Sequence, residues 1–199
     1  MIQPKLQART AKRRPRRPPF RQGDLDGLCG VYAVVNAVAT VAPRMTQPEA
    51  GRLFRAVMAA LRAGDAARVP LVSGGLSRKG LAMAIQNADQ FARRKLGGRL
   101  ASRRVSKALA DPWSIEALWK LLENHLSPTC VAIIGIEGIH SHWTLAVSVT
   151  PKAIHLVDSG NLKFLKRSRC RTRPKPGSNG YHIIDRGSVT FIRWKPLSR

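Results

Sequence analysis

Cysteine is scarce in this sequence, and its placement excludes two common structural uses. The chain has three cysteines, Cys29, Cys130 and Cys170, which are far apart and odd in number. A disulfide framework needs paired cysteines and a cysteine metal site needs closely spaced ones, so neither is indicated. We expect three free thiols, no metal and no cofactor. Free thiols are typical of a reducing compartment, which predicts a cytoplasmic location.

Long hydrophobic runs are also missing. Residues 1–24 are polar and rich in proline, so they do not have the character of a signal peptide. The longest apolar stretches elsewhere suit a buried helix or strand and fall short of the roughly 20 residues that span a bilayer. The sequence therefore predicts no membrane span. Its 199 residues, of which 44% are hydrophobic, are enough for one domain with a core.

Acidic residues are few, and this gives the chain a strong charge of one sign. It has 11 acidic residues against 35 lysines and arginines, for a net charge of +24. Such a surface attracts polyanions, namely nucleic acid, acidic protein surfaces or anionic lipid. A bias towards arginine that only serves solubility explains the charge equally well. Aromatic residues make up only 6% of the chain, and no platform for stacking bases is evident.

The basic residues are concentrated first in the N-terminal segment. Residues 1–20 contain many arginines and prolines, and no acidic residue occurs before Asp24. A segment of this composition cannot bury apolar surface, so we expect a disordered basic arm over 1–20 and one folded domain over 21–199. The arm is compatible with binding nucleic-acid phosphates, with covering a cleft as a leader, or with being a solvated tail.

Periodicity divides the folded part into helices followed by strands. Apolar residues at helical spacing predict helices over 31–41, 48–62, 76–95 and about 111–125. After Pro128 the pattern changes to β-branched runs. The sequence predicts strands over 130–136, 142–149, 153–157, 163–166 and 188–194. Helices first and adjacent antiparallel strands second predict an α+β fold.

The polar loop before the first helix ends in Cys29-Gly30, which places a thiol in the first helical turn. Unpaired backbone N–H groups and the positive end of the helix dipole favour a thiolate there. Such a cysteine is a candidate nucleophile, and it then requires a base, a group that orients the base, and donors for an oxyanion.

His142 and Asp158 are the candidates for the base and its orienting group. His142 begins one predicted strand, directly before Trp143, and Asp158 follows the end of the next. If the two strands form a hairpin, both residues lie at the same end of the sheet. The carboxylate can then accept a proton from one imidazole nitrogen and direct the other nitrogen at Cys29. Taken singly, His142 is equally well a strand-end histidine and Asp158 a turn residue.

Two amides near Cys29 complete the candidate site. Gln22 precedes Cys29 in the same loop, and its side-chain amide together with the Cys29 N–H is a candidate oxyanion hole. Asn36 lies two helical turns after Cys29 on the same face. We interpret Asn36 as a buried polar brace for the site, or alternatively as a hydrogen-bonded core residue.

These motifs resemble the papain-like cysteine peptidase superfamily. The resemblance rests on Gln22, on the run from Asp26 to Asn36, on His142-Trp143-Thr144 and on Val157-Asp158-Ser159, in that order. The Asp-rich loop and the Cys-Gly pair are most similar to its compact bacterial branch, which includes domains that trim double-glycine leader peptides. The resemblance implies a papain-like fold in which an N-terminal helical half, with the nucleophile at a helix N-terminus, packs on a C-terminal antiparallel sheet. It implies that Cys29 is the nucleophile, His142 the base and then acid, Asp158 the orienting group and Gln22 the oxyanion donor.

Three functions are compatible with these residues. The first is a thiol hydrolase that acts on a peptide or isopeptide bond, with an acidic substrate or partner drawn by the positive charge. The second is an acyl-transferase, transglutaminase or glutamine deamidase, which forms the same acyl-enzyme with a different acceptor or leaving group. The third is a basic nucleic-acid-binding protein with an inactive site. The tryptophans lie within apolar stretches and not among the arginines, which makes the third the least favoured.

Overall fold

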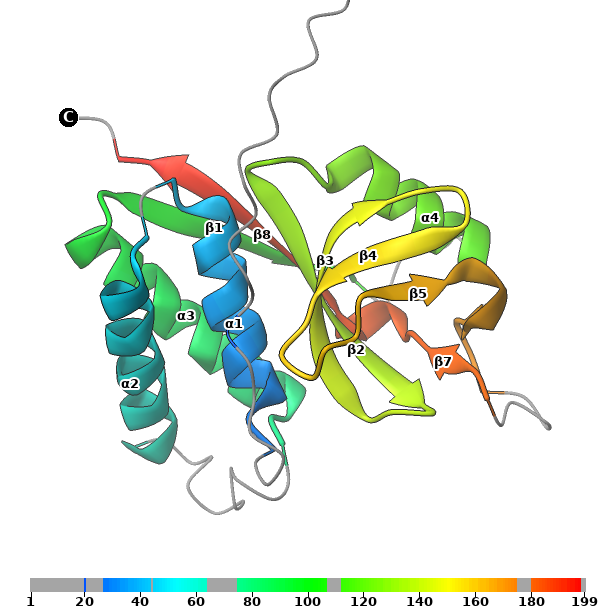
Figure 1. Ribbon diagram of the computed structural model, residues 1–199, viewed down its shortest axis with the longest axis horizontal. Helices are drawn as coiled ribbons and strands as arrows, with labels where there is room; N and C mark the ends of the chain where they lie inside the picture. Colours follow the sequence, from blue (N-terminus) through cyan, green and yellow to red (C-terminus); the bar gives the residue numbers. More distant parts are fainter. Residues whose placement is uncertain are drawn as a thin grey trace, which may run out of the picture.

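Three helices precede most of the sheet along the chain, and a fourth lies between its first two strands (Figure 1). The computed structural model describes residues 20, 27–43, 45–63, 75–106, 112–174 and 180–197. The helices are α1 (Cys29–Val41), α2 (Gln47–Ala63), α3 (Arg78–Lys95) and α4 (Ile115–His125). The strands are β1 (Gly98–Arg104), β2 (Cys130–Gly138), β3 (His142–Val149), β4 (Ala153–Val157), β5 (Phe164–Lys166), β6 (Cys170–Arg171), β7 (His182–Ile183) and β8 (Val189–Pro196), and the 3-10 turns are η2 (Arg167–Arg169) and η3 (Arg186–Ser188).

The main sheet is antiparallel and has the strand order β1-β8-β2-β3-β4-β5. β8, the last strand in sequence, lies between β1 and β2 and joins the helical part of the chain to the hairpins. The short strand β7 pairs with the end of β2, and β6 runs parallel to β7. The protein is therefore α+β, as the order of predicted elements indicated.

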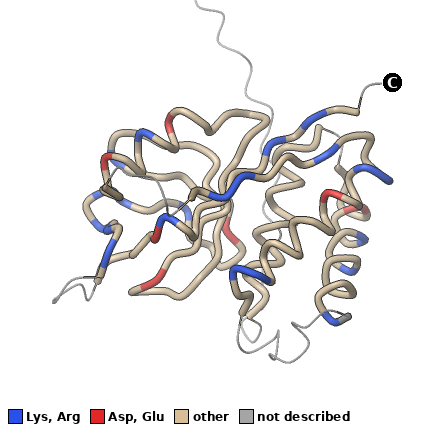
Figure 2. Tube along the Cα trace, turned by 180° about the vertical axis from the view of Figure 1, so that it is seen from behind, with Lys and Arg blue, Asp and Glu red and all other residues tan. Residues whose placement is uncertain are grey.

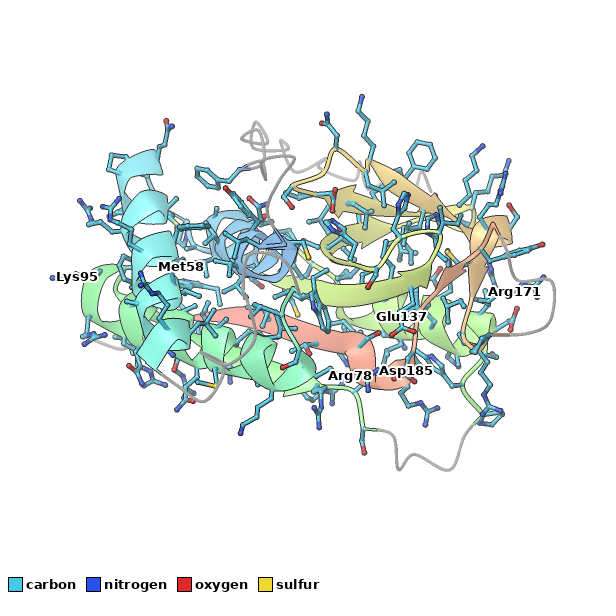
Figure 3. The ribbon with its side chains drawn as sticks, turned by 90° about the horizontal axis from the view of Figure 1, so that it is seen from below. Met58, Arg78, Lys95, Glu137, Arg171 and Asp185 are labelled. Carbon is cyan, nitrogen blue, oxygen red and sulfur yellow. The ribbon has the colours of Figure 1, made fainter. Side chains whose placement is uncertain are left out.

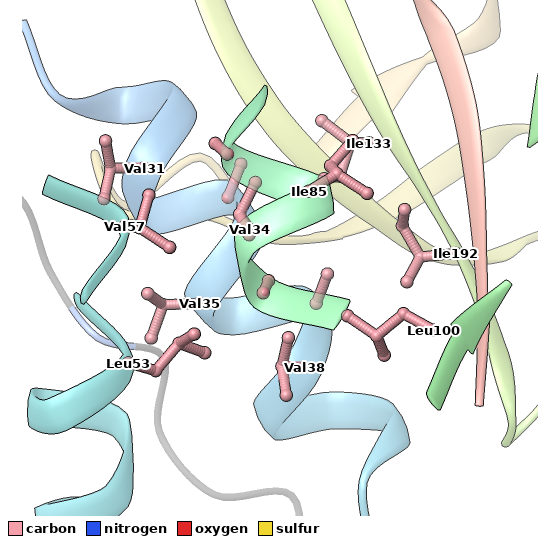
Figure 4. Close-up of a cluster of buried hydrophobic side chains, with 14 of the residues drawn as sticks. Val31, Val34, Val35, Val38, Leu53, Val57, Ile85, Leu100, Ile133 and Ile192 are labelled. Atoms are coloured by element: carbon pink, nitrogen blue, oxygen red, sulfur yellow. The ribbon is translucent and has the colours of Figure 1, made fainter. Parts of the chain in front are cut away.

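The sheet separates two hydrophobic cores, because successive side chains of a strand point to opposite faces. Helices α1, α2 and α3 cover one face, where Val31, Val38 and Leu53 are fully buried together with Ile133 and Ile192 (Figure 4). Helix α4 covers the other face, and its core consists mainly of the neighbouring strand residues and the buried face of α4. Burial of each such valine or leucine side chain contributes about 1.5–3 kcal/mol to the free energy of folding.

The helix ends follow the capping signals in the sequence. At the start of α2, Glu49 Oε2 accepts a hydrogen bond from the Thr46 N–H, and Thr46 Oγ1 accepts one from the Glu49 N–H. Ser77 caps α3 and Ser114 caps α4 through their side-chain oxygens. Helix α1 differs, because its N-cap residue Leu28 provides no side-chain hydrogen bond.

An ion pair connects the start of α3 to the segment that precedes η3. Arg78, at the start of α3, donates to the Asp185 carboxylate, which directly precedes η3, with an Nη2–Oδ2 distance of 2.7 Å (Figure 3). Both side chains are exposed, so the pair stabilises the fold by about 1 kcal/mol at most.

Several predictions can be compared with these elements. The four helices and five strands predicted from periodicity are all present, with ends shifted by a few residues at most. β1, β6 and β7 were not predicted. β1 was missed because its sequence is largely basic and only one of its large side chains, Leu100, is buried. The predicted basic arm and Gln22 lie outside the described residues, except for Phe20. Among the helices described, none has the length and apolar character needed to cross a membrane.

Candidate active site

Cys29 lies at the beginning of α1, where the helix packs against the start of β3. The residue is buried, and its Sγ accepts a hydrogen bond from the backbone N–H of Trp143 at 3.5 Å. Because Leu28 gives α1 no side-chain cap, the N–H groups of the first turn remain directed at this region. The thiol therefore faces backbone donors from two different elements.

Close packing fixes the start of α1 against the segment that precedes α3. A Cβ atom added to Gly30 would lie 2.8 Å from Leu76 Cδ1 and 2.9 Å from Leu76 Cβ, so only glycine fits there without a shift. The carbonyl of Leu76 in turn accepts a hydrogen bond from Trp143 Nε1 at 2.7 Å. Trp143 thus contacts Cys29 through its backbone and the residue packed on Gly30 through its indole.

His142 is the first residue of β3, and its Nε2 lies 2.6 Å from Asp158 Oδ2. Since β3 and β4 are antiparallel, the beginning of β3 and the residue after β4 lie at the same end of the sheet. The Asp158 carboxylate uses its other oxygen, Oδ1, to accept the backbone N–H groups of Gly160 at 2.8 Å and Leu162 at 3.0 Å. Asp158 is therefore held from both oxygens, and Nδ1 of His142 remains for Cys29.

The pKa values of the three groups shift in directions that stabilise charge. Burial alone lowers the pKa of His142, but hydrogen bonds and charges from Asp158 and Cys29 outweigh it and raise the pKa to about 9. Burial alone raises the pKa of Cys29, yet its interactions with His142 and with backbone N–H groups bring the pKa below its ordinary value. Burial also opposes ionisation of Asp158, and the hydrogen bond to His142 is the chief reason that its pKa is nevertheless lowered.

These shifts favour a thiolate and an imidazolium side by side, with a carboxylate behind the imidazolium. The other two cysteines behave differently. Burial raises the pKa of the Cys170 thiol to about 12, and burial is also the main cause of the raised pKa of Cys130. All three cysteines are free thiols. Cys29 alone has a lowered pKa, and it alone lies beside a histidine paired with a carboxylate.

The structure thus brings Cys29, His142 and Asp158 together, and it places Asn36 elsewhere. Asn36 is buried in α1, where its side chain accepts the Phe20 N–H at 3.0 Å and donates to the Phe20 carbonyl at 3.2 Å. It is therefore a hydrogen-bonded core residue that holds the chain before the Cys29 loop. Sequence reasoning missed the role of Leu76, because no local pattern reveals which distant residue packs on a helix start.

No group of three or more histidine, cysteine, aspartate or glutamate side chains within the described ranges has an arrangement that could hold a metal ion. The side chains of the site have a chemistry of their own. These provide a nucleophilic thiolate, a proton donor at the imidazolium, and a carboxylate that keeps the ring oriented.

Comparisons with known proteins give the following findings. No family model matches the sequence, and no curated protein is significantly similar to it. Two similar solved structures are the peptidase domain of Streptococcus ComA, a bi-functional ABC transporter involved in a quorum-sensing pathway, and a double-glycine-motif protease from an AMS/PCAT transporter in complex with the leader peptide. The first has a TM-score of 0.44 at 14% identity and covers 89% of this chain and 97% of its own. The second has a TM-score of 0.41 at 14% identity and covers 91% and 93%. Both are peptidase domains of the kind that the sequence motifs resemble.

Proposed function

We propose that the protein is a cysteine-dependent hydrolase that cleaves a peptide or isopeptide bond, with Cys29 as nucleophile, His142 as acid and base, and Asp158 as the group that orients His142. One observation carries the proposal. The buried Asp158 carboxylate binds Nε2 of His142, and the same histidine lowers the pKa of the thiol at the start of α1. Such a combination matches the needs of nucleophilic catalysis at a carbonyl carbon.

The reaction follows from these positions. The Cys29 thiolate attacks the carbonyl carbon and forms a C–S bond while the carbonyl electron pair moves to oxygen. His142 then donates its Nδ1 proton to the leaving nitrogen as the C–N bond breaks, which leaves an acyl-enzyme and neutral His142. A water molecule transfers a proton to His142 as it attacks the thioester, and collapse of this intermediate releases the acid and restores the thiolate–imidazolium pair.

The negative oxygen formed in each step needs hydrogen-bond donors. The backbone N–H of Cys29 is one candidate, because the N-cap residue Leu28 provides no side-chain cap for α1. We propose the side-chain amide of Gln22, in the preceding loop, as the second. Gln22→Ala is expected to lower kcat by about a hundredfold with little change in KM, in line with the loss of one oxyanion donor.

Selective labelling of the thiol tests the proposal directly. Iodoacetamide at pH 7 is expected to alkylate Cys29 much faster than Cys130 or Cys170, because only Cys29 combines a lowered pKa with a neighbouring imidazolium. Peptide mapping by mass spectrometry gives the three rates in one sample, so Cys130 and Cys170 serve as internal controls. Equal rates for the three thiols in the folded protein would contradict the proposal.

The reaction catalysed is separated from its alternatives by intact-mass analysis of a peptide library incubated with the wild-type protein and with Cys29→Ala. Cleaved products that require Cys29 support the hydrolase. Release of ammonia without chain cleavage identifies a glutamine deamidase instead, and a cross-linked or acyl-transferred product identifies a transferase. Because the thiolate must stay reduced to act, we place this activity in the cytoplasm.

A further inference from the structure

Four basic side chains lie together on one face of the paired strands β1 and β8. Arg99 and Arg103 belong to β1, and Arg193 and Lys195 belong to β8. We call this set the basic ribbon. Arg99 lies directly opposite Lys195 in the strand register, and all four residues are exposed. Figure 2 shows the lysines and arginines that follow one another along these strands.

Helix α4 covers only part of this face of the sheet. The alternate residues of β8, Ile192 and Trp194, point to the other face and pack against the helices. On the side of the basic ribbon, α4 extends only as far as Phe191, where the His125 ring lies with its centroid 4.7 Å from that of Phe191. Apart from His125, which also contacts Arg103, no hydrogen bond or ring contact joins a residue of the described helices to the four basic side chains.

The charges of the basic ribbon are not neutralised within the fold. None of the four side chains forms an ion pair with a carboxylate of the described residues, whereas nearby Arg93 pairs with Asp89 at 2.8 Å. Arg103 donates instead to Nε2 of His125 at 2.7 Å, a neutral acceptor. A cluster of like charges without counter-charges costs folding free energy, and an anionic partner would relieve it.

The outer edge of β1 adds a second feature. β1 is the terminal strand of the sheet, and the N–H of Leu100 turns away from β8 to donate to Asp89 Oδ1 at 2.6 Å. In an antiparallel pair the N–H and C=O of alternate residues point outward, so those of Ser102 and Arg104 share the outward direction of Leu100. No described residue pairs with them, which leaves the Ser102–Arg104 edge open for another strand.

We propose that the basic ribbon and the open edge of β1 together bind an acidic polypeptide segment in extended conformation, which adds to the sheet beside β1. Alternate side chains of a strand repeat every ~6.6–6.8 Å. Arg99 and Arg103 lie two such repeats apart on one face, with Ala101 between them, so acidic residues at every fourth position of the added strand meet them in register. Main-chain hydrogen bonds at Ser102 and Arg104 provide affinity, and the arginines select for acidic sequence.

Other occupants fit less well. The N-terminal arm of this chain cannot be the partner, because residues 1–20 contain no acidic residue. A nucleic acid would satisfy the arginines but not the open N–H and C=O groups, and the basic ribbon has no exposed aromatic side chain on which bases could stack. A second copy of the chain would bring like charges together. In Figure 1 the C-terminal end of β8 lies at the upper left, whereas α1 begins lower down, near the middle of the molecule. The proposal does not depend on the function proposed for Cys29.

A synthetic ten-residue peptide of alternating glutamate and threonine tests the proposal with the full-length protein. We expect binding that weakens as salt rises, and slower amide hydrogen exchange at Ser102 and Arg104 when the peptide is bound. The double variant Arg99→Ser/Arg103→Ser should bind about fivefold or more weakly. Its matched control is Arg52→Ser/Arg55→Ser, which removes the same charge from the exposed side of α2 and should bind as the wild type does.

Three results would overturn the proposal. The first is an equal loss of peptide affinity in both double variants, which would mean that only total charge matters. The second is unchanged exchange at Ser102 and Arg104 in the peptide-saturated wild type, a measurement that does not depend on whether any variant folds. The third is a 20-base-pair DNA duplex that displaces the peptide and binds more tightly, with that binding lost in Arg99→Ser/Arg103→Ser; the site would then be a nucleic-acid site.

Discussion

At the scale of single residues, the candidate site depends on His142, which interacts with the Asp158 carboxylate and with the Cys29 thiol. Asp158 holds Nε2 of His142, which raises the affinity of the ring for its second proton. That positive charge in turn stabilises the Cys29 thiolate. Because Asp158 also accepts two backbone N–H groups, a series of hydrogen bonds runs from the backbone through the carboxylate to the imidazole.

The first prediction concerns the link between Asp158 and Cys29, which do not need to touch. Asp158→Asn removes the charge behind His142, so the pKa of His142 should fall and that of Cys29 should rise. The midpoint of the pH profile for Cys29 alkylation should therefore move to higher pH, and kcat/KM should fall by about tenfold or more. Asp185→Asn removes a carboxylate that pairs with Arg78 and is the control. An unchanged alkylation profile in Asp158→Asn would show that the carboxylate does not act on the thiol.

The second prediction is the pH dependence of turnover. The active form needs Cys29 deprotonated and His142 protonated. Against the effect of burial, interactions with His142 lower the pKa of Cys29, and interactions with Asp158 and Cys29 raise the pKa of His142 to about 9. At high pH, activity is lost as His142 gives up the proton that the leaving nitrogen requires. We expect kcat/KM for a cleaved peptide to fall with a midpoint near pH 9, measured from about pH 5 to about pH 10. A rate that still increases above this midpoint would be inconsistent with an imidazolium acid.

The third prediction concerns Trp143 as a positioning residue. Trp143→Phe keeps the backbone N–H that donates to Cys29 but loses the indole donor to the Leu76 carbonyl. We expect a loss of about 1–3 kcal/mol in the free energy of unfolding, as for an unpaired buried carbonyl, together with a lower kcat. Trp119→Phe is the matched control, because its indole donates to the Thr150 carbonyl away from the site. It should lose stability and keep kcat, so an equal effect on kcat in both variants would assign Trp143 a purely structural role.

At the scale of elements, the start of α1 is positioned by a segment that is distant in sequence. Gly30 and Leu76 meet more closely than any side chain on residue 30 would allow. The sequence could predict the helix, since residues 31–41 form an uninterrupted apolar run. It could not predict that Leu76 is the neighbour, because this contact depends on how α3 packs against α1.

The fourth prediction follows from this contact. Gly30→Ala should destabilise the fold by about 1–3 kcal/mol, because the new methyl group overlaps Leu76 and forces the segment before α3 to move. Leu76→Ala in the same chain should restore part of the loss. Gly51→Ala, in α2, is the control, since its methyl group meets only Arg55 Nη1 at 3.7 Å and should stabilise the helix by about 0.5–1 kcal/mol. Urea unfolding gives the free energy of unfolding of the wild type and of the three variants. A Gly30→Ala protein as stable as Gly51→Ala would contradict this account.

The comparison between sequence and structure shows which elements could be predicted from their local sequence pattern. The hairpin of β3 and β4 was predictable because its strands are adjacent and alternate clearly, and it placed His142 and Asp158 correctly at one end of the sheet. β1 was not predictable, since an edge strand exposed on one face carries a weak apolar pattern. Asn36 is buried, as its position in the apolar run predicted, but no spacing rule could identify Phe20 as its hydrogen-bond partner.

At the scale of the whole molecule, β8 connects parts of the chain that are far apart in sequence. It pairs with β1 on one side and β2 on the other, and it supplies side chains to both cores. No sequence pattern could predict this position, because a strand of the same composition would serve equally well at an edge of the sheet.

The fifth prediction tests this connecting role. A chain that ends at Ser188 retains Cys29, His142 and Asp158 but lacks β8, and with it Phe191, Ile192 and Trp194. We expect it to lose cooperative unfolding and selective alkylation of Cys29. A chain that ends at Pro196 is the control and should behave as the full-length protein does, since the described residue it lacks, Leu197, is exposed. Selective alkylation of Cys29 in the shorter chain would show that the site assembles without β8.

The position of β8 also has a consequence for synthesis on the ribosome. Cys29, His142 and Asp158 all precede β8 in the chain, and β8 must still be translated before the sheet can close between β1 and β2. A nascent chain therefore carries its reactive groups while they are still unassembled. On the proposed chemistry, the new polypeptide becomes an active hydrolase only after β8 has left the exit tunnel. It therefore does not cleave neighbouring nascent chains before that point.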